Sequence, residues 1–359
     1  MSERALTRRL LRWYARARRD LPWRRTHDAY AIWVSETMLQ QTRIQTVLPY
    51  YERFMRELPT VLALAEAPEE RVLALWSGLG YYRRARLLQA AARRIVTAYG
   101  GRVPQEAQQL LELDGIGKYT AGAIASIAFG KRAALVDGNV ARVLSRLYAI
   151  RDNVASARGS ARLWEHARRL VAAVDGDPGD WNQALMELGA TVCTPRDPRC
   201  RECPVSGQCA ALATGVVTEL PTRATKTAPS VLHRTAVVLA SSRRVLHARR
   251  RKDLLFGGLW EPPTAAGQLG KLASVLGIEA DVLRPSGEVV HDLTHRRMHV
   301  EVVRGTLPRR RRWVLPSSEY DAIEPVALEE LARDAGRRGY STLTRKVLAV
   351  ANVAPGGLR

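Results

Sequence analysis

The spacing of apolar residues changes once along the chain, and this change constrains the fold more than any other feature of the sequence. Over residues 1–215 the apolar residues recur at helical spacing, whereas beyond residue 232 the apolar runs are short and β-branched. The sequence therefore predicts a mainly α domain followed by an α+β domain. Helices are expected near 29–57, 61–66, 69–76, 83–99, 105–113, 119–129, 137–149, 159–174, 180–191, 327–335 and 342–350. Strands are expected at Thr235–Ala240, Val245–Ala248, Val289–Val290, His299–Val303 and Trp313–Leu315.

A polar stretch bounded by prolines separates the two patterns. Pro221–Ser230 lacks apolar periodicity, as linkers do. We therefore expect one domain over 1–220, a linker over 221–232 and a second domain over 233–359. The length of 359 residues is sufficient for two or three domains.

The charge balance points to a polyanionic partner. Lysine and arginine number 56 and aspartate and glutamate 35, so the net charge is +21. A folded chain with this charge most often binds nucleic acid. The alternative is that an arginine-rich composition merely raises the isoelectric point.

Neither a membrane nor a secreted protein is expected. No apolar run approaches the roughly 18 residues of a membrane span, and the N-terminus offers no apolar signal segment. We expect a cytoplasmic, nucleoid-associated monomer without membrane contact.

All four cysteines fall in one short stretch with the spacing C-x6-C-x2-C-x5-C. Clustered thiolates in a large chain usually ligate a metal. Zinc ribbons pair two C-x2-C knuckles, whereas here one pair is flanked by single cysteines and by arginines. The spacing favours a [4Fe–4S] cluster over zinc, and both over free thiols. The predicted ligands are Cys193, Cys200, Cys203 and Cys209.

The segment Leu110–Thr120 has the pattern of a helix–hairpin–helix. Gly115 and Gly117 permit a tight turn and close approach of the backbone to a ligand. The helix that follows begins near Tyr119 and presents its first N–H groups to a phosphate. The alternative is an ordinary turn between helices, but the charge of the chain favours a sequence-independent grip on DNA.

Two carboxylates stand out, although each has an ordinary interpretation. Glu36 lies in an apolar stretch, where it can be an acid near a helix N-terminus. Asp137 precedes a glycine and a predicted helix, where it can be an N-cap. Taken together, a carboxylic acid with a raised pKa and an ionised carboxylate are the pair that breaks a glycosidic bond.

These segments together resemble one family, the adenine DNA glycosylases of the MutY type, within the helix–hairpin–helix glycosylases. The resemblance rests on the hairpin, the cysteine spacing, Leu21–Arg24, Ser35–Thr42, Gly78–Tyr82 and Val136–Val140. It implies a six-helix barrel over 28–135 and an iron–sulfur module formed by 1–27 and 136–220. It further implies removal of adenine paired with 8-oxoguanine or G in double-stranded DNA, after the adenine is flipped out of the stack.

The resemblance also implies roles for individual residues. Glu36 would be the general acid at adenine N7, Asp137 the carboxylate that stabilises the sugar cation, and Asn139 the residue that orients this site. Adenine would lie against Trp23, Arg24 and Gln183. Gln41 and Tyr81 would push into the stack near the 8-oxoguanine, and Lys118 would meet a DNA phosphate.

One catalytic position argues against strand cleavage. In related endonuclease III-type enzymes a lysine two residues after the second hairpin glycine forms a Schiff base, and here that position is Tyr119. We therefore expect a monofunctional glycosylase. An endonuclease III-like glycosylase/lyase and a non-catalytic iron–sulfur DNA-binding protein are the alternatives.

The C-terminal half resembles a Nudix fold at Phe256–Pro263, but the acids that hold Mg²⁺ in Nudix hydrolases are missing from the stretch that follows. We therefore expect a Nudix-like fold that lacks the pyrophosphate-hydrolysing activity of Nudix enzymes. In MutY-type proteins this domain reads 8-oxoguanine with a Phe-Ser-His turn, and here the turn is Leu293-Thr294-His295. The resemblance assigns this reading to Thr294 and His295. A metal site at His291, His295 and His299 is not expected, because four-residue spacing in a hairpin forms no common face.

Overall fold

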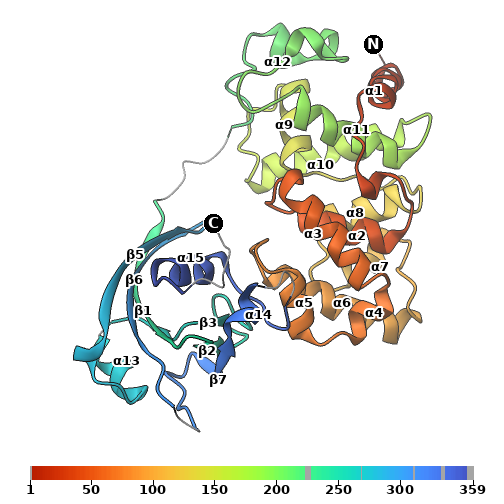
Figure 1. Ribbon diagram of the computed structural model, residues 1–359. Coiled ribbons are helices and arrows are strands. Elements are labelled where there is room, and N and C mark those ends of the chain that lie inside the picture. The colour runs from red at the N-terminus through yellow and green to blue at the C-terminus, as the bar shows by residue number, and fades with distance from the viewer. Residues whose placement is uncertain (1, 223–227, 268, 310–311, 333–335, 354–359) are drawn as a thin grey trace. The chain divides into compact units, whose positions relative to one another are not determined.

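The computed structural model describes residues 2–222, 228–267, 269–309, 312–332 and 336–353. The chain divides into two compact units (Figure 1). The first consists of Met1–Ala65 and Ala90–Lys226, and the second of Glu66–Gln89 and Thr227–Arg359. The second unit therefore includes a segment from the helical half of the sequence.

The regular elements among the described residues of the first unit are all helices, as the apolar spacing predicts. Its helices are α1 (Glu3–Ala17), η1 (Pro22–Arg24), α2 (Ala29–Leu39), α3 (Ile44–Glu57), α4 (Val61–Glu66), the end of α6 (Arg83–Tyr99), α7 (Ala107–Leu111), α8 (Lys118–Ile127), α9 (Gly138–Leu147), α10 (Ala157–Ala172), α11 (Pro178–Thr191), η2 (Cys200–Glu202), η3 (Ser206–Gln208) and α12 (Ala210–Ala213). Among the described helices, none combines the length and the apolar composition that a membrane crossing requires.

The region expected to be helical over 29–57 is in fact two helices. α2 ends at Leu39 and α3 begins at Ile44, and between them Gln41 adopts a left-handed φ of 58°. α2 is predominantly apolar and is buried from Ala29 to Met38, its polar residues Ser35, Glu36 and Thr37 included, as expected of a helix without a solvent-facing polar side.

α11 lies at the centre of the first unit and contacts α1, α8, α9 and α10. Trp181 and Leu188 of α11 pack in one core with Leu10 of α1 and Leu144 of α9. A glycine allows its close contact with the start of α9: a Cβ on Gly189 would lie 2.6 Å from the Cβ of Asn139.

The second unit contains a seven-stranded sheet in the order β3-β2-β1-β6-β5, with β4 paired to β1 and β7 to β2. β1 and β6 are parallel, and β5 and β6 form an antiparallel hairpin. The strands are β1 (Ser230–Ala240), β2 (Arg244–Arg250), β3 (Trp260–Glu261), β4 (Thr264–Ala265), β5 (Arg284–Asp292), β6 (Arg296–Thr306) and β7 (Tyr320–Ala327). The helices are α5 (Glu69–Leu75), the start of α6, α13 (Leu269–Val275), η4 (Ala280–Val282), α14 (Leu328–Ala332) and α15 (Thr342–Val350).

Alternate residues of β1 supply two apolar cores, one on each face of the sheet. Val238 packs with Val347 of α15, and Val237 packs with Leu272 of α13. This alternation is the expected result of the two-residue repeat of a strand. The strand predicted at Trp313–Leu315 was wrong, because these residues have no strand pairing, and β7 was not predicted.

The segment Glu66–Gln89 is joined to the C-terminal part of the second unit by polar contacts. Ser77 Oγ and Tyr82 OH both donate hydrogen bonds to the carbonyl of Tyr340, at 2.6 and 3.0 Å. Lys252 Nζ lies 2.9 Å from Glu69 Oε2. The linker predicted over 221–232 includes 223–227, which lie outside the described residues, and β1 begins at its residue Ser230.

Candidate active site

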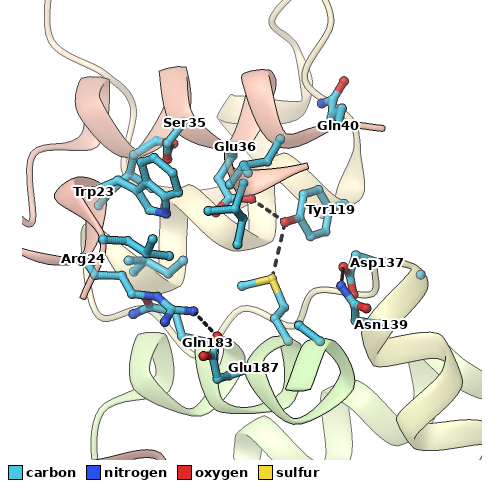
Figure 2. A pocket seen from close by; sticks show the side chains of 18 of the residues that line it. Trp23, Arg24, Ser35, Glu36, Gln40, Tyr119, Asp137, Asn139, Gln183 and Glu187 are labelled. Carbon is cyan, nitrogen blue, oxygen red and sulfur yellow. Dashed lines mark hydrogen bonds and ion pairs between the residues drawn. The ribbon is translucent and has the colours of Figure 1, made fainter. Parts of the chain in front are cut away.

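One cavity of the first unit is lined by most of the residues that the sequence singles out. It has a volume of about 390 Å³. Side chains reach it from η1, α2, α11, the segment after α2 and the starts of α8 and α9 (Figure 2). Two carboxylates that lie about a hundred positions apart in the sequence are among them. The singled-out residues that line the cavity are Trp23, Arg24, Glu36, Gln41, Tyr119, Asp137, Asn139 and Gln183.

Glu36 lies in the buried helix α2, and only 5% of it is exposed. The hydroxyl of Tyr119 donates a hydrogen bond to Glu36 Oε2 (Figure 2). Burial raises the pKa of Glu36 to about 7; the hydrogen bond from Tyr119 opposes this rise and the charge of Asp137 adds to it. Near neutral pH a large share of Glu36 is therefore protonated, as a general acid requires.

Asp137 is the N-cap of α9. Its Oδ1 accepts a hydrogen bond from the backbone N–H of Val140 at 2.7 Å, and its Oδ2 accepts one from Asn139 Nδ2 at 2.9 Å. Burial raises the pKa of Asp137, and these hydrogen bonds act against that rise. Asn139 is held in turn by Arg142, whose Nη2 donates to Asn139 Oδ1 at 2.8 Å. One carboxylate thus caps α9 and also lines the cavity.

Tyr119 is directed into the cavity from the first turn of α8, whereas its neighbour Lys118 is exposed. The Tyr119 hydroxyl also lies 3.4 Å from Met186 Sδ. Burial raises the pKa of Tyr119 well above its usual range, so the hydroxyl keeps its proton at physiological pH.

A cluster of ion pairs lies where η1 lines the cavity. Glu187 of α11 is fully buried, and its Oε1 lies 2.7 Å from Arg19 Nε while its Oε2 lies 2.8 Å from Arg24 Nη2. Burial raises the pKa of Glu187, but the hydrogen bonds and charges of the two arginines outweigh it and lower the pKa. Trp23 makes an edge-to-face contact with Tyr51, with ring centroids 5.1 Å apart. Glu187 therefore holds the guanidinium of Arg24, which the family resemblance predicts to lie in the adenine pocket.

Some cavity residues were not found by sequence reasoning. Glu187 lies four positions after Gln183, so both fall on one face of α11, and this spacing could have found it. Ser35, Gln40 and Met186 also line the cavity, and nothing in their spacing distinguishes them.

The hairpin between α7 and α8 turns at Gly115, which has a φ of 76°, and Gly117 is the N-cap of α8. Gly117 and Lys118 are exposed. The first N–H groups of a helix have no acceptor within the helix, so the start of α8 offers donors and a positive charge at the surface.

The four cysteines line one small cavity together with Arg146 of α9. Arg146 is buried, and its Nη1 lies 3.3 Å from Cys193 Sγ and 2.7 Å from the carbonyl of Thr194. None of the four is in a disulfide. Among the described residues, no group of three or more histidine, cysteine or acidic side chains is arranged to hold a metal ion.

The remaining singled-out residues belong to the second unit. Tyr81 has a φ of 48° and is 46% exposed. Its hydroxyl lies 2.5 Å from Thr294 Oγ1 in the turn between β5 and β6. The carbonyl of His295 accepts a hydrogen bond from Ser230 N at 3.1 Å, which attaches this turn to the start of β1.

Comparisons with known proteins agree with this architecture. Residues 34–169 match the HhH-GPD superfamily of base excision DNA repair proteins, and residues 234–336 match the NUDIX domain. A thermostable thymine-DNA glycosylase of known structure superposes with a TM-score of 0.54 at 33% identity, over 59% of this chain and 97% of that one. The fold class expected from the sequence is confirmed.

Curated relatives extend the match to most of the chain. The adenine DNA glycosylase of Homo sapiens is 38% identical over 398 residues, which cover 90% of this chain and 72% of the human one. That of Arabidopsis thaliana is 42% identical over 295 residues, covering 71% of this chain and 46% of its own length. The chain therefore belongs to the adenine DNA glycosylases of base excision repair, hydrolases that act on N-glycosyl bonds.

Proposed function

We propose that this protein removes adenine that is paired with 8-oxoguanine or G in double-stranded DNA and leaves an abasic site. The observation that carries the proposal is the pair Glu36 and Asp137 in one cavity, with the acid in an apolar helix and the carboxylate at a helix N-terminus. This is the pairing that glycosidic bond cleavage requires.

In this proposal Glu36 supplies the proton and Asp137 the negative charge. Glu36 protonates adenine N7, which makes the base a better leaving group. The bond between N9 and the sugar breaks, and its electron pair leaves with the base. The carboxylate of Asp137 stabilises the cationic sugar until water adds to its C1′ and loses a proton, and Asn139 keeps that carboxylate in position.

The flipped adenine would occupy the 390 Å³ cavity against Trp23, Arg24 and Gln183. Arg24 Nη2 lies 2.8 Å from Glu187 Oε2, and this ion pair, which holds the guanidinium in place, supports a role for Arg24 in binding the adenine. The exposed start of α8 would grip the DNA backbone through Gly115, Gly117 and Lys118.

We further propose that the second unit reads the base opposite the adenine, with Thr294 and His295 at the turn and Tyr81 beside them. The hydrogen bond between Tyr81 and Thr294 supports a shared role. Gln41, whose left-handed backbone directs it to the cavity of the first unit, would enter the stack from the adenine side.

We propose the four cysteines as the ligands of a [4Fe–4S] cluster. All four line one cavity and a buried guanidinium lies beside Cys193, although their side chains as they stand are not arranged around a metal ion. The positive charge of Arg146 suits four thiolates. A bound cluster would tie the cysteine loop together through iron–thiolate bonds. We propose 1–27 and 136–220 as the module that holds it, and 28–135 as the six-helix barrel. Absorbance near about 410 nm, with iron and zinc analysis, tests the assignment.

Tyr119 in place of a Schiff-base lysine supports a monofunctional enzyme. Borohydride trapping should yield no protein–DNA adduct that depends on Lys118. Trapping that is lost in Lys118→Ala would instead support a glycosylase/lyase.

A single-turnover assay on three duplexes tests the function as a whole. We expect adenine release from 8-oxoguanine:A and G:A and no cleavage at thymine glycol. Activity on thymine glycol would favour the endonuclease III-like alternative, and tight binding without any base release would favour a non-catalytic DNA-binding protein.

A further inference from the structure

Met186 presents an unusual hydrogen-bond acceptor to Tyr119, the hydrogen-bond partner of the proposed general acid. It belongs to α11 and lines the cavity, and its Sδ lies 3.4 Å from the Tyr119 hydroxyl that also contacts Glu36. Tyr119 therefore stands between a carboxyl group and a thioether, with its one hydroxyl proton within reach of both.

The Tyr119 hydroxyl has two possible acceptors for its one proton, Glu36 and Met186, and the protonation state of Glu36 determines which one it uses. When Glu36 is ionised, the Tyr119 proton points to Glu36 Oε2. When Glu36 is protonated, its own O–H can donate to the Tyr119 oxygen, and the tyrosine proton then needs another acceptor. A hydroxyl both donates and accepts, so it can reverse its direction if that acceptor exists.

We propose that Met186 is a positioning residue that accepts the Tyr119 hydroxyl proton when Glu36 is in its acid form, and so favours the acid form. The inference rests on the proposed function, in which Glu36 is the acid. No bond to hydrogen breaks in this step; the tyrosine O–H rotates from the carboxylate to the sulfur.

The other charged groups that face Glu36 already have partners or cannot accept. Asp137 accepts hydrogen bonds from Val140 and Asn139, and Glu187 is held by both Arg19 and Arg24. Arg24 has only donors. The sulfur of Met186 is thus the acceptor that the geometry places beside the hydroxyl.

A thioether is a weak acceptor, so the expected effect is small but measurable. Met186→Leu keeps most of the side-chain volume and removes the sulfur. The acid form then loses one weak hydrogen bond, and the apparent pKa of Glu36 in the rate profile should fall by about half a unit.

The test is the pH dependence of single-turnover adenine release at saturating enzyme, on a G:A duplex. The proposal expects a lower midpoint in Met186→Leu, and a midpoint at or above the native one in Met186→Gln, whose amide carbonyl is a stronger acceptor. Met38→Leu, at a fully buried methionine of α2 that does not line the cavity, is the matched control and should keep the native midpoint.

Tyr119→Phe separates this role from simple packing. In that background Met186→Leu should cause no further shift, because the hydroxyl is gone. A native midpoint in Met186→Leu, or an equal shift with and without the hydroxyl, overturns the inference. The proposed function fails separately, if Glu36→Gln still releases adenine at the native rate.

Discussion

The middle of α2 and the start of α9 each contribute one carboxyl group to the same cavity, but in contrasting surroundings. Glu36 accepts one tyrosine hydroxyl within an apolar helix. Asp137 accepts a backbone N–H and a side-chain amide at a helix N-terminus, where the helix dipole favours negative charge. Burial raises the pKa of both, so the donors around each one decide which carries the proton.

The largest effect is expected from Glu36→Gln. The amide keeps the shape of the side chain but cannot protonate a base, and general acid catalysis contributes roughly a hundredfold to ten-thousandfold. Single-turnover release should fall by about a thousandfold or more, while binding to the mispaired duplex survives. A loss of less than tenfold would contradict the assignment of Glu36 as the general acid.

Two substitutions at Asp137 separate its two uses. Asparagine is itself a good N-cap, so Asp137→Asn should keep the stability of α9 and lose roughly a hundredfold to a thousandfold in rate. Asp137→Ala should lose the rate and also about 1 kcal/mol of stability. Thermal unfolding beside the single-turnover rate measures both. An Asp137→Asn enzyme with near-native rate would show that the carboxylate is only a cap.

Glu187 is a third carboxylate that lines the cavity. Its pKa is lowered by two arginines, whereas the pKa values of Glu36 and Asp137 are raised. Glu187→Gln removes the charge between Arg19 and Arg24, of which Arg19 is partly exposed. We expect a loss of about 2 kcal/mol in the free energy of unfolding, after allowance for solvent screening. Glu202→Gln, at an exposed pair, is the control and should be neutral.

The last prediction concerns the native enzyme and its pH dependence. With a Glu36 pKa of about 7, the acid form is present below that pH and is lost above it. The single-turnover rate should therefore fall by about tenfold per unit well above pH 7. A flat profile between about pH 6 and 9 would mean that Glu36 does not supply the proton.

The prediction that the two carboxylates share one site depended on the hairpin, the cysteine spacing and the other family segments taken together. Alone, Glu36 and Asp137 each had an ordinary explanation, and for Asp137 the N-cap interpretation is also correct. The spacing from Gln183 could have brought Glu187 into the site, but its ion pairs could not be predicted, because their partners lie 163 and 168 positions away. The roles assigned to these residues stay predictions.

The errors in the fold have similar physical origins. Residues 40–43 are Gln-Gln-Thr-Arg, polar but without a glycine or proline to signal a helix end. The break between α2 and α3 therefore depends on the left-handed backbone of Gln41, which is rare outside glycine and asparagine. β7 escaped notice because Pro325 and acidic residues interrupt its alternation. Trp313–Leu315 has the residue types of a strand, but none of the described strands pairs with it.

The missing side chain of Gly189 has a consequence for inherited variation in this protein. A methyl group at that position would overlap Asn139, so any substitution must displace either α11 or the side chain that donates a hydrogen bond to Asp137. Gly189 takes no part in the chemistry and lies some fifty positions from the residue it would disturb. A missense change there would nonetheless resemble a defect in catalysis, and a screen of variants by motif alone would class it as harmless.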